Sequence, residues 1–319
     1  MGQTKPTQGD RACDVAVVVV TYNSESLLED FFAAIPAAMD GIESYVVVVS
    51  DNASADSSIG LAQRLSPDSV IVRSDANKGY ATAINAGVVA AGKAANILVL
   101  NDDIRLRPGS VRSLLDGIAA DHQVGIAVPR LVDGDGRLLL SQRREPTISR
   151  AFGEAILGGD RAGRFDKLGG VVQDRDAYYR QTDPTWTSGC AWLISGTCWE
   201  SVGQWDESLF LYSEDVDYAL RTRDAGFVMR FVPEAEAVHL VGPSHRDPRL
   251  WSMAVWNRYR LYNRRHGFVR SQLFRLGLLL NESIRALAGR GVHGAGALAL
   301  ISTSHRPPEV HGNLPPISR

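Results

Sequence analysis

Apolar runs and helical patterns alternate along the first part of the chain. Residues 15–20 are apolar at every position, which is typical of a central strand covered on both faces. A helical pattern begins at Glu25 and keeps its apolar residues at helical spacing. The alternation then repeats, predicting strands at 45–49, 69–72, 96–100 and 124–128 and helices at 56–65, 80–91 and 108–120. Such alternation predicts βαβ units, and therefore an α/β fold with a mostly parallel sheet and flanking helices.

The pattern weakens after residue 130. Residues 130–185 are rich in Gly, Arg and Asp, and we interpret them as an irregular insertion. Order returns with predicted strands at 192–195 and 228–232 and predicted helices at 197–202 and 214–225. We therefore assign one main domain to residues 13–245, followed by a helical extension of amphipathic helices over 246–291. The polar termini, 1–12 and 292–319, are expected to be disordered.

Polar residues follow four of the predicted strands at the point where each strand ends. They form the tripeptides 21–23, 50–52, 77–79 and 101–103, which are rich in Asp, Asn and Thr. In open α/β sheets, ligands bind beyond the carboxyl ends of the strands. Four such ends in register therefore predict a binding site at this rim.

Composition narrows the class of protein. The net charge of −2 and the pI near 6.4 argue against nucleic-acid binding, which needs a basic surface. Cys13, Cys190 and Cys198 lack the spacing of a metal site and are too few for a disulfide framework, which favours a cytoplasmic location. No secretory signal and no membrane-spanning window is evident in the sequence.

Several common motifs of α/β enzymes are missing. No GxGxxG follows the first strand, which argues against a dinucleotide dehydrogenase, and no GxSxG provides a hydrolase nucleophile. A nucleotidyltransferase would carry a Gly-rich, basic loop after the first strand, and TYNSES is neither. A non-catalytic binding relative of an enzyme remains an alternative at this point.

Two acidic clusters are candidates for chemistry. Asn101-Asp102-Asp103 supplies hard oxygen ligands for a divalent cation, although a polar turn before the next helix explains it about equally well. Residues 213–217 hold three carboxylates within four positions. They either complement a helix start or place a general base near a substrate. His239 alone is a weak candidate for a metal or phosphate contact.

The order of the motifs resembles one family. VVVVTYNS, SDNAS, NKGYATAINAG, LNDD, SLFLYSEDVDYALRTRDAG and a late His occur in the order found in family 2 glycosyltransferases of the Rossmann-like GT-A fold. The resemblance covers roughly residues 13–265 and is nearest to the bacterial rhamnosyltransferase-like branch. It implies a GT-A domain, to which the C-terminal helical extension is added, and we interpret the 130–185 insertion as carrying part of the acceptor side.

The resemblance also implies residue roles. Those that would bind the nucleotide sugar are Thr21, Tyr22, Asn23, Asp51 (on the base), Asn77, Lys78, Gly79, Asn85 and Asp102. Asp103 would be the direct metal ligand, joined by His239. Asp215 would be the catalytic base, and Glu214 would orient the acceptor or the base.

Three positions depart from the family pattern. Asn101 stands where the first Asp of the DxD motif is expected. Trp205 replaces a Phe, and we expect this change to alter packing or the acceptor site without abolishing the chemistry. Tyr218 replaces a Leu, which we expect to have no consequence.

The implied reaction is a single in-line displacement that inverts the anomeric configuration, with Mg²⁺ or Mn²⁺ as cofactor. The expected donor is dTDP-L-rhamnose, with a UDP-hexose as the alternative. The expected acceptor is a hydroxyl of a lipid-linked or cell-surface glycan precursor. The helix over 251–265 mixes aromatic and basic residues, so it either packs on the core or contacts a membrane at the inner face of the cell envelope. A homodimer stays open.

Overall fold

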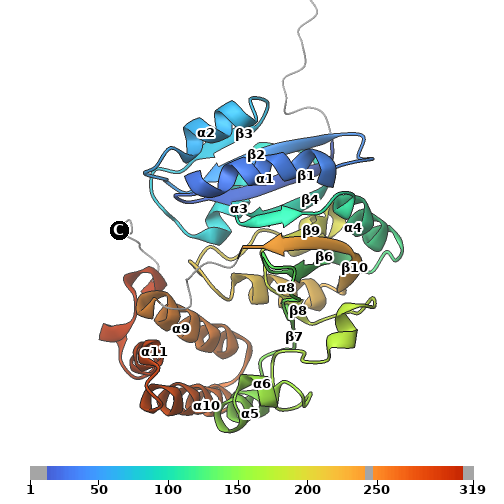
Figure 1. Cartoon of the computed structure of the whole chain (residues 1–319). Coiled ribbons are helices and arrows are strands. Elements are labelled where there is room, and N and C mark those ends of the chain that lie inside the picture. The colour runs from blue at the N-terminus through green and yellow to red at the C-terminus, as the bar shows by residue number, and fades with distance from the viewer. Residues whose placement is uncertain (1–12, 241–246, 312–319) are drawn as a thin grey trace, which may run out of the picture.

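The computed structural model describes residues 13–240 and 247–311. An eight-stranded mixed sheet lies at its centre, in the order β3-β2-β1-β4-β9-β6-β10-β5 (Figure 1). Its strands are β1 Cys13–Thr21, β2 Tyr45–Asp51, β3 Val70–Arg73, β4 Ala94–Asn101, β5 Ile104–Leu106, β6 Val124–Val132, β9 Ala191–Ser195 and β10 Val228–His239. The first four in the order are parallel, whereas β9 runs antiparallel to both of its neighbours and β5 runs antiparallel to β10.

Helices cover both faces of the sheet, as the apolar run in β1 predicts. Val15, Val17 and Val19 pack with α1 (Glu25–Ala38), α2 (Ser58–Leu65) and α4 (Ser110–Ala119). The alternate residues Ala16, Val18 and Val20 pack with α3 (Tyr80–Ala91), α7 (Gly196–Val202) and α8 (Glu214–Asp224). Because neither face of β1 meets solvent, its sequence carries no polar alternation.

Three C-terminal helices form a second layer beside the sheet (Figure 1). They are α9 (Pro248–Arg265), α10 (Phe268–Leu287) and α11 (Gly291–Ile301). Tyr262 of α9 stacks on Phe274 of α10 at 3.9 Å between ring centroids. α5 (Ile148–Leu157) joins this layer, because a Cβ at Gly277 of α10 would come within 2.8 Å of the Ala151 Cβ.

Two expectations fail in this layer. Residues 292–311 are not disordered: they form α11 and two 3₁₀ helices, Thr303–His305 and Pro308–His311. The glycines of α11 lower its helix propensity, but packing of the buried Ala299 and Leu300 outweighs that preference. The 130–185 segment is not wholly irregular either, since it contains α5. The buried residues of α5 are small, so its helical period is weak in the sequence. Residues 1–12 and 312–319 lie outside the described parts.

The rest of the 130–185 segment carries short elements. These are β7 Gln142–Arg143, α6 Gly159–Ala162 and a 3₁₀ helix at Arg175–Tyr178; β7 pairs with β8 (Trp186–Thr187) in a separate ribbon. Of the two interpretations of the 251–265 helix, packing is the one observed, because Tyr259 and Tyr262 are buried. Across residues 13–240 and 247–311, no helix combines the length and apolarity needed to span a bilayer.

The order of α11 can be tested with a matched pair of leucines. Leu300 is fully buried and Leu298 on the same helix is 44% exposed. We expect Leu300→Ala to lower the free energy of unfolding by about 2–5 kcal/mol, and Leu298→Ala to change it by no more than about 0.5 kcal/mol. Urea denaturation measures both, and equal, near-zero effects would mean that α11 does not pack.

Candidate functional site

The first two strand ends are tied together by Asp51. Its Oδ1 accepts a hydrogen bond from the Thr21 hydroxyl at 3.0 Å and one from the Ser54 hydroxyl, and its Oδ2 accepts from the Ser54 backbone N–H at 2.9 Å. The carboxylate is fully buried. Asn23 joins the same loop, with its N–H donating to the Ser54 hydroxyl at 2.9 Å. Asp51 thus orders the rim here, and contact with a nucleotide base would require this loop to open.

Asn52 joins the second strand end to the third. Its side-chain amide donates to Asn77 Oδ1 at 2.8 Å and to the Gly79 carbonyl at 3.1 Å, and accepts from the Lys78 N–H at 2.9 Å. Gly79 has φ +95°, and a Cβ there would lie 2.3 Å from the Phe210 carbonyl oxygen. The turn therefore requires glycine at this position. Lys78 is half-exposed at the rim, where its ammonium lies 2.6 Å from the Asp75 carboxylate.

Asn85 does not reach this rim, contrary to the expectation that it binds the nucleotide sugar. Its amide donates to the Trp205 carbonyl at 3.0 Å and to Glu207 Oε1 at 2.9 Å, and its Oδ1 accepts from the Trp205 N–H at 2.9 Å. The side chain is buried, with its three contacts all inside the protein. Asn85 therefore fixes the 205–207 segment against α3.

The two aromatic departures from the family pattern pack on each other. Trp205 stacks on Tyr218 with ring centroids 4.9 Å apart and planes 17° apart, and Trp192 lies 5.3 Å from Trp205. Trp205 is buried and does not itself line the cavity, but it lies directly behind Gly189 of the cavity wall, so the change is one of packing beneath that wall. Tyr218 is the residue on which Trp205 stacks, so the two departures from the family pattern together form one buried aromatic stack.

The fourth strand end holds the candidate metal ligands. Asp103 Oδ2 lies 3.2 Å from His239 Nε2, and both side chains are largely buried. Asp102 accepts a hydrogen bond from the Ser24 hydroxyl. Burial, with the adjacent Asp103 charge, raises the pKa of Asp102 to about 6. Although burial lowers the pKa of His239, hydrogen bonds to Asp103 and Cys190 raise it to about 10.

These residues fit a divalent cation that also takes ligands from a substrate. Asp103 Oδ1 is buried without a hydrogen-bond partner. The other oxygen of the same carboxylate, Oδ2, faces the His239 imidazole. In the described parts of the chain no three acidic, His or Cys side chains converge on one point. A protein-only metal cage is therefore absent there. Mg²⁺ and similar ions are commonly held by one or two carboxylates plus substrate phosphates, which matches this incomplete set.

The second acidic cluster begins α8. Glu214 and Asp215 follow Tyr212 and Ser213, which have φ +67° and +73°. Left-handed backbone at two consecutive non-glycine residues costs roughly 1–3 kcal/mol each and is characteristic of functional turns. Asp215 Oδ2 accepts from the Gly189 N–H at 3.2 Å, and Asp215 Oδ1 accepts from the Val216 N–H at 2.8 Å. The turn thus presents Asp215 in one fixed orientation.

The two adjacent carboxylates differ in their surroundings. Glu214 is buried, with Oε2 unpaired, and burial together with the Asp215 charge raises its pKa well above the usual range. Burial also raises the pKa of Asp215, but two backbone N–H groups and the Arg143 charge oppose the shift. The surroundings of Asp215 therefore favour its charged form more than the surroundings of Glu214 do.

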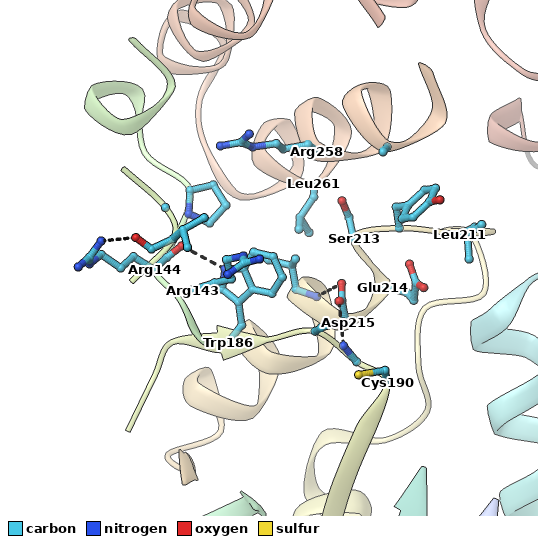
Figure 2. A pocket seen from close by; sticks show the side chains of 18 of the residues that line it. Arg143, Arg144, Trp186, Cys190, Leu211, Ser213, Glu214, Asp215, Arg258 and Leu261 are labelled. Carbon is cyan, nitrogen blue, oxygen red and sulfur yellow. Dashed lines mark hydrogen bonds between the residues drawn. The ribbon is translucent and has the colours of Figure 1, made fainter. Parts of the chain in front are cut away.

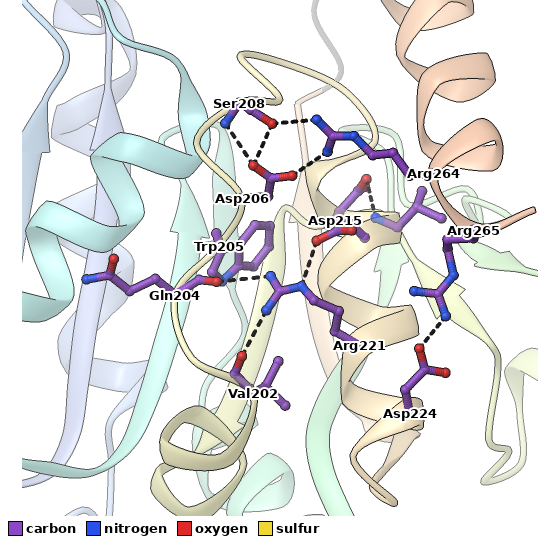
Figure 3. Close-up of polar contacts among 12 residues, drawn as sticks. Val202, Gln204, Trp205, Asp206, Ser208, Asp215, Arg221, Asp224, Arg264 and Arg265 are labelled. Atoms are coloured by element: carbon purple, nitrogen blue, oxygen red, sulfur yellow. Dashed lines mark hydrogen bonds and ion pairs between the residues drawn. The ribbon is translucent and has the colours of Figure 1, made fainter. Parts of the chain in front are cut away.

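Helix α9 holds the strained turn from outside. Asn257 is fully buried, and its amide donates to the Leu211 carbonyl at 2.9 Å. Further contacts tie α9 to the same region, as Figure 3 shows: Arg264 contacts Asp206, and Arg265 contacts Asp224 of α8. The C-terminal layer therefore sets the position of Asp215, although it contributes no acidic side chain to the turn.

Arg221 fastens the first turns of α8 to the loop before it (Figure 3). Its Nε donates to Asp217 at 2.7 Å, and its other nitrogens donate to the carbonyls of Val202 and Gln204 at 2.9 and 3.0 Å. Asp217 is therefore held in a structural ion pair with Arg221. Of the three carboxylates in the acidic cluster, Asp215 alone combines partial exposure with a place on the cavity wall.

A cavity of about 480 Å³ opens in front of Asp215 (Figure 2). One wall consists of the sheet rim at Asn101 and of residues 188–190. The opposite wall consists of α5 and α9, with Glu154 and Arg258 3.0 Å apart across them. A Cβ at Gly189 would lie 2.8 Å from the Asp215 Cβ, so glycine is needed where the wall meets the carboxylate. The cavity can receive a substrate beside Asp215.

Sequence reasoning missed Ser24, Gly189, Asn257 and Arg143. Ser24 directly follows the polar tripeptide 21–23, so its place at the rim could have been predicted from the sequence. The others lie outside the motifs, and only the fold brings them to the acidic turn. Of the expected residues, the structure brings Thr21, Asn23, Asp51, Asn77, Lys78, Gly79, Asp102, Asp103 and His239 to one rim, with Glu214 and Asp215 at the adjoining cavity. Tyr22 follows β1 at this rim and is half-buried.

The arrangement of rim, acidic turn and cavity agrees with comparisons to known proteins. Residues 16–184 match the family described as glycosyl transferase family 2. The chain belongs to glycosyl transferase family 2. Its curled mixed sheet with flanking helices is the GT-A fold, and the chain is a glycosyltransferase of the rhamnosyltransferase-like kind.

Two relatives align with most of this glycosyltransferase. The N-acetylglucosaminyl-diphospho-decaprenol L-rhamnosyltransferase of Mycobacterium tuberculosis is 31% identical over 253 residues, which covers 73% of this chain and 78% of the relative. A low-salt glycan biosynthesis hexosyltransferase of Haloferax volcanii is 25% identical over 231 residues, covering 71% and 67%.

Solved structures support the GT-A fold. A mannosyltransferase from Pyrobaculum calidifontis, in complex with GDP-Man and Mn²⁺, superposes with a TM-score of 0.56 at 16% identity and covers 95% of this chain and 79% of its own. TarS residues 1–349 of S. aureus, in complex with UDP-GlcNAc, superposes with a TM-score of 0.56 at 13% identity, covering 93% and 82%.

The clamp by Asn257 can be tested separately from overall stability. Asn257→Ala removes the hydrogen bond to the Leu211 carbonyl, and we expect the turn before Asp215 to relax. Because a small displacement of a reacting group is costly, we expect kcat to fall about ten- to a hundredfold while the donor KM stays the same. Steady-state kinetics would measure this, with Asn263→Ala, an exposed neighbour on α9, as control. Unchanged kcat in the Asn257 variant would show that the clamp has no part in catalysis.

Proposed function

We propose that this chain transfers L-rhamnose from dTDP-L-rhamnose to a hydroxyl of a sugar linked through diphosphate to a polyprenol. The observation that carries the reaction is the Asp215 carboxylate, fixed by the Gly189 N–H at the wall of a cavity that adjoins the Asp103–His239 pair. Support for the sugar and the acceptor comes from the 31% identical mycobacterial relative, whose name specifies both.

Asp215 acts as the base in the proposed reaction. One of its oxygens takes the proton of the acceptor hydroxyl as the hydroxyl oxygen bonds to the anomeric carbon of the donor. The bond between that carbon and the diphosphate oxygen breaks at the same time, and the nucleoside diphosphate leaves with the electron pair. Attack opposite the leaving group inverts the anomeric configuration. Burial and the Asp215 charge raise the pKa of Glu214, which disfavours a second negative charge in the turn.

A divalent cation, Mg²⁺ or Mn²⁺, would be held by Asp103 and His239, and it would neutralise the diphosphate as that group departs. Asp102, held by Ser24, would lie beside the same diphosphate. Thr21, Asn23 and Asn77 order the loops around the nucleotide. A second candidate, a non-catalytic relative that only binds nucleotide sugars, is less well supported because Asp103 and Asp215 are both retained.

Contact with a membrane surface belongs to the same proposal, because the acceptor carries a lipid. The sequence drew attention to α9, but α10 offers the better surface. Its side chains Val269, Leu273, Leu276, Ile284 and Leu287 are exposed at positions that repeat with the helical period, and Arg270 and Arg290 lie exposed near its two ends. An exposed apolar stripe flanked by basic residues suits the interface of an anionic bilayer.

The donor half of the proposal is tested by thermal stability. With dTDP-L-rhamnose at about a hundredfold excess over its dissociation constant, we expect a stabilisation of roughly 2.7 kcal/mol. The shift should require Mn²⁺ or Mg²⁺ and should disappear in Asp103→Asn. A larger shift with a UDP-hexose would replace the proposed donor.

The base is tested in the same preparation. Asp215→Asn should keep the metal-dependent shift, because the donor loops are intact, but should lose about 10²–10⁴-fold in kcat. Since burial raises the pKa of Asp215 and the base must be deprotonated, wild-type kcat should rise with pH on a limb above the usual range of aspartate. Full activity of Asp215→Asn would exclude this residue as the base.

Membrane contact is tested by cosedimentation with vesicles of phosphatidylglycerol and phosphatidylcholine. We expect wild type to bind the anionic vesicles, and Leu273→Glu with Leu276→Glu to release it, since a charge at each position breaks the apolar stripe. Val89→Glu, at an apolar residue of α3 that is 70% exposed, is the control and should bind as wild type does. Equal binding by all three proteins would show that α10 is not the contact surface.

A further inference from the structure

The cavity beside Asp215 is rich in arginine. Arg143, Arg144, Arg150 and Arg258 all line it, and its acidic lining among the described residues consists of Glu154, Glu214 and Asp215. Several positive charges in one cavity are costly unless each guanidinium has partners. The groups that each arginine contacts therefore indicate whether it holds the fold or is left for a ligand.

Two of the four arginines hold the fold. Arg144 donates to the carbonyls of Gly163, Gly169 and Val171 and contacts Asp166 at 2.7 Å. Arg150 donates to the carbonyls of Glu145 and Asp166. Both therefore fix the loop after α5 and leave little donor capacity for a ligand.

Arg143 differs from Arg144 and Arg150 because part of its guanidinium has no partner among the described residues. Its Nη1 donates to the carbonyls of Leu140 and Gln142, whereas Nε and Nη2 have no hydrogen-bond partner in the described parts of the chain. Desolvation by burial lowers the pKa of this guanidinium, so its charge is held in an unfavourable place. Figure 2 shows Arg143, Trp186 and Asp215 together at the cavity. A partly buried guanidinium with one unused edge is suited to receive an anion.

Arg258 adds donors from the helix on the other side (Figure 2). Its Nη2 donates to Glu154 at 3.0 Å, and its remaining nitrogens have no hydrogen-bond partner among residues 13–240 and 247–311. Glu154 orients Arg258 and also accepts from the Gly170 N–H at 2.8 Å, so this carboxylate is satisfied within the protein. Arg143 and Arg258 thus both line one cavity and both carry N–H groups that no described residue uses.

We infer that Arg143 and Arg258 bind the diphosphate of the acceptor, and so select a sugar that is attached to its lipid through diphosphate. This rests on the proposed function, in which Asp215 receives the proton of the acceptor hydroxyl. The donor also carries a diphosphate, but its expected ligands Asp103 and His239 lie outside this cavity wall. Planar guanidinium groups match phosphate oxygens in pairs, which makes arginine the suitable residue.

Two acceptors separate this inference from the proposed function. One is N-acetylglucosamine joined through diphosphate to a short prenyl chain, and the other is a neutral alkyl N-acetylglucosaminide of similar length. For Arg143→Gln we expect kcat/KM to fall about ten- to a hundredfold on the diphosphate acceptor, because a charge-assisted contact is lost. The neutral acceptor and the donor KM should be unaffected, and Arg143→Lys should lie between the two.

The control is Arg112→Gln, an exposed arginine on α4 that should behave as wild type with both acceptors. Equal losses by Arg143→Gln on both acceptors would overturn the inference, and so would a raised donor KM, which would assign Arg143 to the donor. If wild type transfers to neither acceptor, the proposed function fails. Calorimetric binding of the prenyl diphosphate sugar, without donor or metal, then still decides the inference, since Arg143→Gln must bind it more weakly than wild type.

Discussion

Repulsion between two adjacent carboxylates at the start of α8, one buried and one partly exposed at the cavity wall, is the constraint around which this part of the molecule is built. Burial raises the pKa of both Glu214 and Asp215, and their surroundings differ: Glu214 is left with an unpaired oxygen, and Asp215 receives two backbone N–H groups. This difference depends on left-handed backbone at Tyr212 and Ser213. Such backbone persists only where its surroundings hold it, and here α9 does so through Asn257.

Much of the sheet rim could be predicted from the sequence, because residues that are neighbours in the chain determine it. An all-apolar run predicts a strand covered on both faces, and polar residues directly after it must lie at the sheet edge. Thr21, Asp51 and Asp103 were therefore placed correctly at the rim. The pattern of apolar and polar residues does not predict which groups hydrogen-bond to each side chain. Asp51 has the right position, yet the Thr21 and Ser54 hydroxyls already hold its carboxylate, and Asn85 is turned to the 205–207 segment.

The acceptor side was predicted less well, because its causes are contacts between distant segments. α5 and α11 bury Ala151, Ala155 and Ala299, residues too small to give a strong helical period. Trp205 and Tyr218 were read as separate departures, although they are one stacked pair across 13 positions of sequence, 205 to 218. Arg143 and Asn257 belong to no motif. Their importance is visible only when the fold brings them to one turn and one cavity.

The position of β9 has a consequence for how such proteins can diverge. The matched family region ends at residue 184, yet β9 follows it in sequence and lies between β4 and β6 in the sheet. The chain that leaves the sheet to build part of the cavity wall thus returns to the middle of the sheet before α9 completes that wall. The strands of the sheet and the segments of the cavity wall are therefore interwoven along the chain. Exchange of the whole region from 130 to 265 would replace β9 in the middle of the sheet as well as the cavity wall.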